Sequence, residues 1–187
     1  MKRICLSLFV AILCVGWASG ADVTKQINRI KQAYATAQNT IAKADDEPMT
    51  RNTFSINIEQ MYPGSGPHKE VVQFYFTCLD FSEEDNAKDG SINWKSNLYL
   101  VRQSYNIAAR NFYCEYLFDM ETSEPLFYLF TYPDDNANQQ TLRVYFDKGK
   151  VISTIPDKSM VNAKSILQEF KRLQSLFKTA ILESPLI

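Results

Sequence analysis

The pattern of hydrophobic and polar positions changes its period twice along the chain. Between residues 23 and 44, apolar side chains recur at alternating steps of four and three, the spacing of one helix face. From Thr53 onward, apolar and polar side chains alternate, as they do in a half-buried strand. After Pro156 the helical spacing returns, and it predicts a last helix from about Ser159 to Leu182. The pattern therefore predicts a helix, a run of strands and a second helix.

The central region is predicted to form six or seven strands. Clusters of proline, glycine, asparagine and aspartate at residues 63–67, 133–136 and 147–149 are typical of turns between strands. Residues 82–90 are acidic and predict a solvated loop, and residues 104–111 remain ambiguous. The strands are expected from Thr53 and at residues 71–81, 97–103, 112–119, 126–132, 141–146 and 150–155. Strands joined mostly by short turns usually pair as an antiparallel meander.

The predicted fold class is α+β. It has an N-terminal amphipathic helix, an antiparallel meander of six or seven strands, and a C-terminal amphipathic helix packed on the sheet. The strands carry apolar residues on both faces, so a helix packed on one face leaves the apolar residues of the other face to be accounted for. That face is either a second layer of core or an exposed aromatic binding surface.

The first twenty residues read as a cleavable export signal. Lys2 and Arg3 precede an apolar run at residues 4–17, and small residues follow at 18–21. The run is shorter than the roughly 20 residues of a membrane-spanning helix, and Leu13 is too large for the residue before a lipid-modified Cys14. We expect a signal peptide at 1–20, a single α+β domain at 21–187 and export to the periplasm or cell exterior. We expect neither a lipid anchor nor a transmembrane segment after cleavage.

Removal of this segment changes the charge and the cysteine count. The mature chain would keep 18 basic residues against 21 acidic ones, a net charge of about −3. This gives no basic excess for nucleic acid, and we exclude that class of partner. Cys78 and Cys114 remain, each within an aromatic alternation, and in an oxidising compartment they are candidates for a disulfide. The alternative is two buried thiols acting as small hydrophobes.

No constellation typical of a catalytic or metal site stands out. His68 is the only histidine and is predicted to lie on a loop surface, whereas nucleophilic catalysis needs it beside a nucleophile. One histidine and two distant cysteines do not make a zinc site. The acidic residues 80–90 lack ligands at the positions that a calcium loop requires, and residues 134–136 are interpreted in the same way. We expect no metal, no cofactor and no catalytic residue.

Two groups of residues leave catalysis by carboxylates and binding by aromatic stacking open as alternatives. Glu59, Glu115 and Asp119 lie near strand positions and are candidates for a pair of catalytic carboxylates. Aromatic side chains in or near the strands could stack on a sugar or a peptide, although such residues are more often core. These are Trp94, Tyr99, Tyr105, Tyr113 and Tyr128.

Three short stretches carry a resemblance. They are Tyr116-Leu117-Phe118-Asp119, Pro125-Leu126-Phe127-Tyr128 and the hairpin from Arg143 to Ile152. Together they resemble a pattern in small exported bacterial proteins of unknown function, where a tyrosine-rich strand ending in Asp precedes a hairpin with Arg, Tyr, Phe and Gly-Lys. The resemblance covers about forty residues. It implies a periplasmic or secreted meander protein and transfers no catalytic residue.

The sequence is compatible with three functional hypotheses. The leading expectation is a non-catalytic exported protein that binds a protein or glycan partner. The second is a small-ligand carrier with an apolar pocket. The third is a small hydrolase that uses two carboxylates, whose pKa values its cleft would have to push apart.

Overall fold

A computed structural model describes residues 20–46, 52–64, 66–78, 96–157 and 161–182. Residues 1–19 of the predicted signal peptide, the acidic residues 80–90 and Trp94 lie outside this range.

The described part has the predicted order of helix, strands and helix. Seven strands form one sheet in sequence order, and each pairs antiparallel with the next, which confirms the α+β meander. The elements are α1 (Gly20–Asp46), β1 (Thr53–Tyr62), β2 (Gly66–Cys78), β3 (Ser96–Ile107), β4 (Arg110–Phe118), β5 (Pro125–Pro133), β6 (Gln139–Asp147), β7 (Lys150–Ile155) and α2 (Ala163–Leu182).

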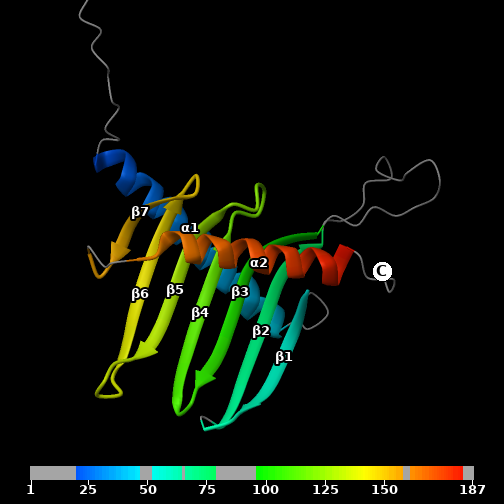
Figure 1. Ribbon diagram of the computed structural model, residues 1–187. Coiled ribbons are helices and arrows are strands. Elements are labelled where there is room, and N and C mark those ends of the chain that lie inside the picture. The colour runs from blue at the N-terminus through cyan, green and yellow to red at the C-terminus, as the bar shows by residue number, and fades with distance from the viewer. Residues whose placement is uncertain (1–19, 47–51, 65, 79–95, 158–160, 183–187) are drawn as a thin grey trace, which may run out of the picture.

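The two helices cover opposite faces of the sheet, which gives three layers (Figure 1). On α1, Ile30, Ala37 and Ile41 are buried against one sheet face. On α2, Phe170, Leu173 and Phe177 are buried against the other. Beneath the helices both sheet faces are therefore core, which accounts for the apolar residues on both sides of the strands.

Aromatic contacts fix the position of α2. Phe170 is fully buried, and its ring meets those of Tyr116, Phe118 and Phe146 edge-on at centroid distances of 5.2, 4.9 and 5.9 Å. Such pairs contribute about 0.5–1.5 kcal/mol each beyond the burial of their area. The helix is thereby held across β4 and β6.

The ambiguous residues 104–111 form a tight hairpin between β3 and β4. Ala108 turns the chain with a φ of 52°, in the left-handed region that non-glycine residues seldom adopt. The predicted hairpin at residues 141–155 is confirmed, with Lys148 and Gly149 at φ values of 49° and 72°. Both turns are short, as a meander requires.

Helix α2 begins at Ala163 and not near Ser159. The side chain of Asn162 caps this end, because its Oδ1 accepts a hydrogen bond from the backbone N–H of Ser165 at 3.1 Å. Neither described helix combines the length and the hydropathy of a membrane span.

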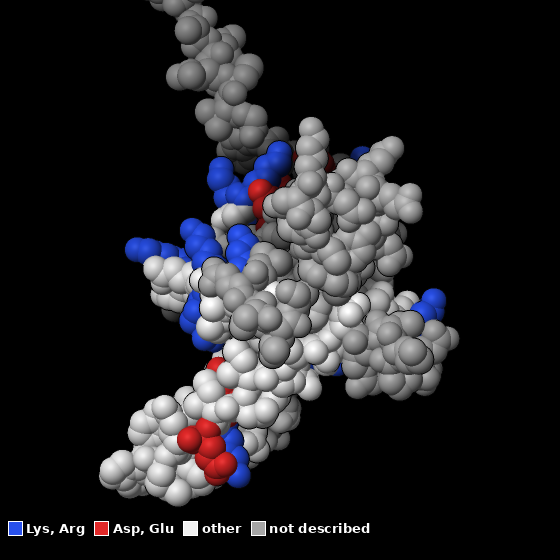
Figure 2. Space-filling model, turned by 90° about the vertical axis from the view of Figure 1, so that its right-hand side faces the viewer, with Lys and Arg blue, Asp and Glu red and all other residues white. Residues whose placement is uncertain are grey.

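The strands are longer than the layer of helices that covers them. In Figure 1 both helices cross the upper half of the sheet, while the turns β1–β2, β3–β4 and β5–β6 lie below them. Figure 2 looks towards the β1 edge and shows this lower end projecting as a mostly uncharged lobe, while Lys and Arg gather higher up. The uncovered lower sheet is where the candidate site lies.

Candidate functional site

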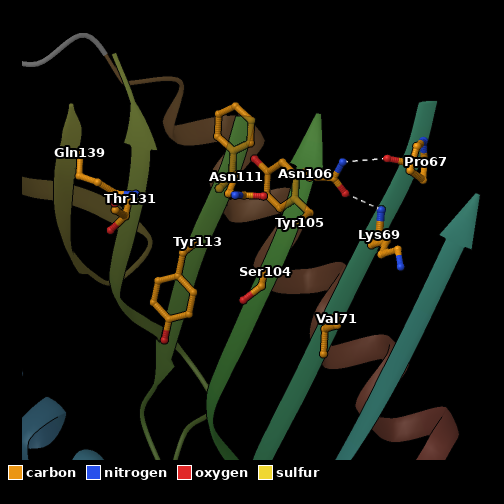
Figure 3. A pocket seen from close by; sticks show the side chains of 11 residues that line it. Pro67, Lys69, Val71, Ser104, Tyr105, Asn106, Asn111, Tyr113, Thr131 and Gln139 are labelled. Atoms are coloured by element: carbon orange, nitrogen blue, oxygen red, sulfur yellow. Dashed lines mark hydrogen bonds between the residues drawn. The ribbon is translucent and has the colours of Figure 1, made fainter. Parts of the chain in front are cut away.

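A groove of about 500 Å³ runs over the uncovered sheet on the face that carries α1 (Figure 3). Its lining comes from the lower ends of five strands, β2 to β6. Four of its side chains stand in one row across the strands, because Val71, Ser104, Tyr113 and Thr131 are directly paired in the register. Since paired residues point to the same sheet face, this row forms the floor of the groove.

The polar groups of the groove are available for a ligand. Ser104, Asn111, Thr131 and Gln139 make no side-chain hydrogen bond to any described residue, and they are exposed or half-buried. Hydroxyl groups donate and accept, and amides offer both an acceptor and two donors. The groove therefore presents four neutral hydrogen-bonding side chains close together.

Asn106 closes one end of the groove. Its Nδ2 donates to the carbonyl of Pro67 at 2.8 Å, and its Oδ1 accepts from the N–H of Lys69 at 2.6 Å (Figure 3). The same Nδ2 also donates to the carbonyl of Ala108 at 2.9 Å. This amide is used to join the β1–β2 and β3–β4 turns, so it shapes the groove and is not free to bind.

No acid or histidine is among the described residues that line the groove, and Lys69 is its one charged residue. The Lys69 ammonium pairs with Glu59 at 3.2 Å on the exposed β1–β2 hairpin. General acid–base catalysis needs a group that exchanges a proton near neutral pH. The described lining of the groove offers no acid or histidine for such a step.

Tyr113 connects the groove to a buried polar cluster beneath α1. Its hydroxyl donates to Glu115 Oε1 at 2.5 Å, and Arg102 Nε donates to the same oxygen at 3.2 Å. From α1, the Tyr34 hydroxyl and Gln38 Nε2 donate to Glu115 Oε2. Burial, followed by these bonds to Glu115, raises the pKa of both tyrosines.

Arg102 completes the cluster. Its Nη2 donates to Gln38 Oε1 at 2.5 Å, and its Nη1 donates to the Tyr75 hydroxyl at 3.4 Å. Glu115 is only 4% exposed, so its charge depends on these partners. The cluster ties α1 to β2, β3 and β4, and it holds the Tyr113 ring on the floor of the groove.

The three acids expected near strand positions do not meet in one cleft. Glu115 is buried in the cluster, and Glu59 is exposed on β1. Asp119 pairs with Arg29 at 3.3 Å, and N–H groups of Thr122 and Glu121 lower its pKa although burial opposes the change. The structure therefore separates these carboxylates into three different environments.

The disulfide expected between Cys78 and Cys114 is not formed, and Cys114 is a free, buried thiol. The register places Cys114 level with Val72, two strands away and six residues from Cys78 along β2. Six residues of strand span about 20 Å, whereas bridged cysteines need Cα atoms within about 7 Å. The side chain of Cys78 lies outside the described range. Burial raises the pKa of the Cys114 thiol to about 11.

Of the described aromatic candidates, only Tyr113 places its ring in the groove. Tyr105 borders the groove, but its side chain packs on the α2 face with the core cluster there, and Tyr99 and Tyr128 are 3% and 9% exposed. Asp134 begins a turn: its Oδ1 accepts from the N–H groups of Asn136 and Asn138 at 2.9 Å each. In the described residues no group of three or more His, Cys, Asp and Glu is placed to hold a metal ion.

His68 is not on a loop surface, contrary to the sequence-based expectation. It lies on β2, with a side chain 22% exposed, and it faces the Glu70 carboxylate. The prediction was wrong because β2 begins at Gly66, immediately after the turn, so Pro67 and His68 are already paired with β1. Proline is tolerated near the start of a strand.

The sequence reasoning also missed Ser104, Asn111, Thr131 and Gln139. The sequence shows these neutral polar residues near the ends of predicted strands. Whether they are exposed depends on how much of the sheet the two helices cover, which the sequence does not show. Comparison with protein-family models, with curated proteins and with solved structures gives no match to this chain. The site's own geometry therefore carries the functional conclusion.

Proposed function

We propose that this is an exported, non-catalytic binding protein whose groove at the lower end of the sheet holds a neutral glycan. The observation that carries the proposal is the set of four unpartnered polar side chains over a groove of about 500 Å³. Sugar hydroxyls donate and accept hydrogen bonds, as do the hydroxyls and amides of the groove. The apolar face of a sugar ring suits the Tyr113 ring on the floor.

Charge supports a neutral ligand. Lys69 is the only charged residue among those that line the groove, and it is already paired with Glu59. The projecting lobe is also mostly uncharged on the side shown in Figure 2. A strongly ionic ligand would gain little here, whereas a hydroxyl-rich one would meet several partners.

The other two functions expected from the sequence have less support. A carrier would place its ligand in an apolar interior, but the buried apolar residues on both sheet faces pack against α1 and α2. A hydrolase would need two acids in one cleft, and Glu59, Glu115 and Asp119 lie in separate surroundings. Binding without catalysis is the function that the groove favours.

Titration with neutral oligosaccharides tests the proposal. We expect chitohexaose, cellohexaose or mannohexaose to bind in calorimetry and to shift the backbone amide signals of β3 and β4 in NMR. The Asn111→Ala variant should bind about fivefold more weakly, because one net hydrogen bond contributes about 1 kcal/mol. Ser104→Phe should abolish binding, because the new ring fills the floor of the groove.

The Gln168→Ala variant is the matched control, since it removes an exposed amide from α2 on the opposite side of the sheet. Its affinity should equal that of the unaltered protein. The proposal fails if none of the three oligosaccharides binds, or if Ser104→Phe folds normally by circular dichroism and still binds with full affinity.

A further inference from the structure

A second cavity, of about 320 Å³, lies on the α2 side of the sheet. His68 and Glu70 of β2, Tyr105 and Ile107 of β3, and Glu169 of α2 are among its lining residues. It is distinct from the groove, which faces the α1 side. The polar groups of this cavity have no role in glycan binding.

The hydrogen bonds of His68 determine where its proton sits. Its Nδ1 lies 2.5 Å from the carbonyl oxygen of Asn106, which only accepts, so Nδ1 carries the hydrogen. In the neutral ring Nε2 is then an acceptor. Nε2 faces Glu70 Oε2 at 3.8 Å, too far for a direct hydrogen bond. Two acceptors thus face one another across a gap.

A chain of hydrogen bonds holds Glu70 in this position. Gln103 Nε2 donates to Glu70 Oε1 at 2.8 Å, and the Tyr116 hydroxyl donates to Gln103 Oε1 at 3.1 Å. Gln103 and Tyr116 are 8% and 4% exposed, so the chain is fixed within the core. It engages Oε1 and leaves Oε2 directed to His68.

No described lysine or arginine forms an ion pair with Glu70, although the Arg172 guanidinium acts on this carboxylate electrostatically from beyond contact distance. Glu169, the other carboxylate of the cavity, accepts three hydrogen bonds of 2.5–3.0 Å from Arg172. Among the described side chains, only His68 lies within ion-pair distance of Glu70. When the imidazole is neutral, the cavity therefore holds one carboxylate, Glu70, that no described cation contacts.

We propose that this cavity binds a primary alkylammonium group, such as that of an alkyl diamine or of a lysine side chain. An ammonium has three N–H donors and one positive charge. It would donate to Glu70 Oε2 and His68 Nε2 together, which satisfies both acceptors and balances the charge. Tyr105 and Ile107 offer an apolar wall to the alkyl chain, and a tyrosine ring also attracts a cation.

Nitrogen NMR of the imidazole tests this directly, because His68 is the only histidine of the chain. At pH 8.5 and constant ionic strength, cadaverine and N-acetyl-lysine methylamide are titrated separately into the protein. We expect a saturable shift of the Nε2 signal with at least one of them. The tighter of the two identifies a free diamine or a peptide lysine as the better fit. The uncharged 1-pentanol should give no saturable shift.

Variants separate this site from general electrostatics. Glu70→Gln should weaken amine binding at least tenfold, whereas Glu121→Gln, at an exposed glutamate in the turn after β4, should leave it unchanged. His68→Gln, followed by calorimetry, tests the second acceptor should Glu70→Gln not fold. The proposal is overturned if neither amine gives a saturable shift, if 1-pentanol acts equally, or if folded Glu70→Gln binds with full affinity.

Discussion

Replacing Arg102 with methionine is expected to lower the free energy of unfolding by about 3–5 kcal/mol, the usual effect of removing one partner of a buried ion pair. The variant leaves the Glu115 carboxylate, 4% exposed, without the cation that pairs with it at 3.2 Å. Gln38 also loses the guanidinium that donates to its side-chain oxygen. Urea denaturation followed by circular dichroism measures the change.

A double variant distinguishes the charge from the packing. Arg102→Met combined with Glu115→Leu removes both charges, so it should cost less than the sum of the two single variants. Arg143→Met is the control at an exposed arginine on β6 and should change stability by less than about 0.5 kcal/mol. A cost below about 1 kcal/mol for Arg102→Met would contradict the role assigned to the pair.

The same cluster connects stability to the proposed binding site. Tyr113 donates to the oxygen of Glu115 that Arg102 also contacts, so the ring on the groove floor is held by the buried pair. Helix α1, which covers only the upper half of this sheet face (Figure 1), thus helps to hold the Tyr113 side chain in place on the uncovered half. This arrangement lets the groove keep its shape without a covering element.

The order of the elements could be predicted because each helix or strand has its own local spacing of apolar residues along the sequence. The alternation at Phe54, Ile56 and Ile58 and the turn at Lys148-Gly149 need no tertiary information to be recognised, and both are in the structure. The boundaries were less certain. Residues 104–111 carry no glycine or proline, so the β3–β4 turn at Ala108 lacks the usual signal.

The sites could not be predicted in the same way, because they depend on packing between distant segments. Glu115 appears as an ordinary strand carboxylate until α1 places Tyr34 and Gln38 over it. His68 shares a strand face with Glu70 only because β2 begins before it, and the pairing of β2 with β3 then brings the Asn106 carbonyl to its ring. The disulfide prediction failed for a related reason: both cysteines lie in aromatic strands, but the register separates them along the sheet.

Stability should fall steeply at alkaline pH because several tyrosines are buried. Tyr116 and Tyr128 are 4% and 9% exposed, and burial, followed by the nearby Cys114, raises the pKa of both hydroxyls. In the unfolded chain a tyrosine ionises near pH 10. Above that pH the unfolded state releases protons that the folded state keeps, so the stabilisation present below pH 10 is progressively lost.

The expected slope follows from the number of groups. Each hydroxyl that stays protonated only in the folded protein costs about 1.4 kcal/mol per pH unit, so Tyr116 and Tyr128 alone cost about 2.8 kcal/mol per unit above pH 10. Tyr34 and Tyr113, whose pKa values are also raised, make the total slope steeper. The Cys114 thiol, whose pKa burial raises to about 11, begins to contribute earlier. An unfolded thiol ionises near pH 8.5. Urea midpoints at pH 8, 10 and 11 measure the slope, and tyrosinate absorbance should rise together with unfolding.

The Tyr128→Phe variant isolates one of these groups. It loses the hydroxyl that lies 3.5 Å from Cys114 Sγ, so it is expected to be less stable than the unaltered protein at pH 8. Its slope above pH 10 should nevertheless be smaller by about 1.4 kcal/mol per pH unit, because one buried titrating group is gone. Tyr62→Phe, at a residue 48% exposed, should leave the slope unchanged. An unaltered slope in Tyr128→Phe would show that this hydroxyl ionises as readily in the folded protein as in the unfolded chain.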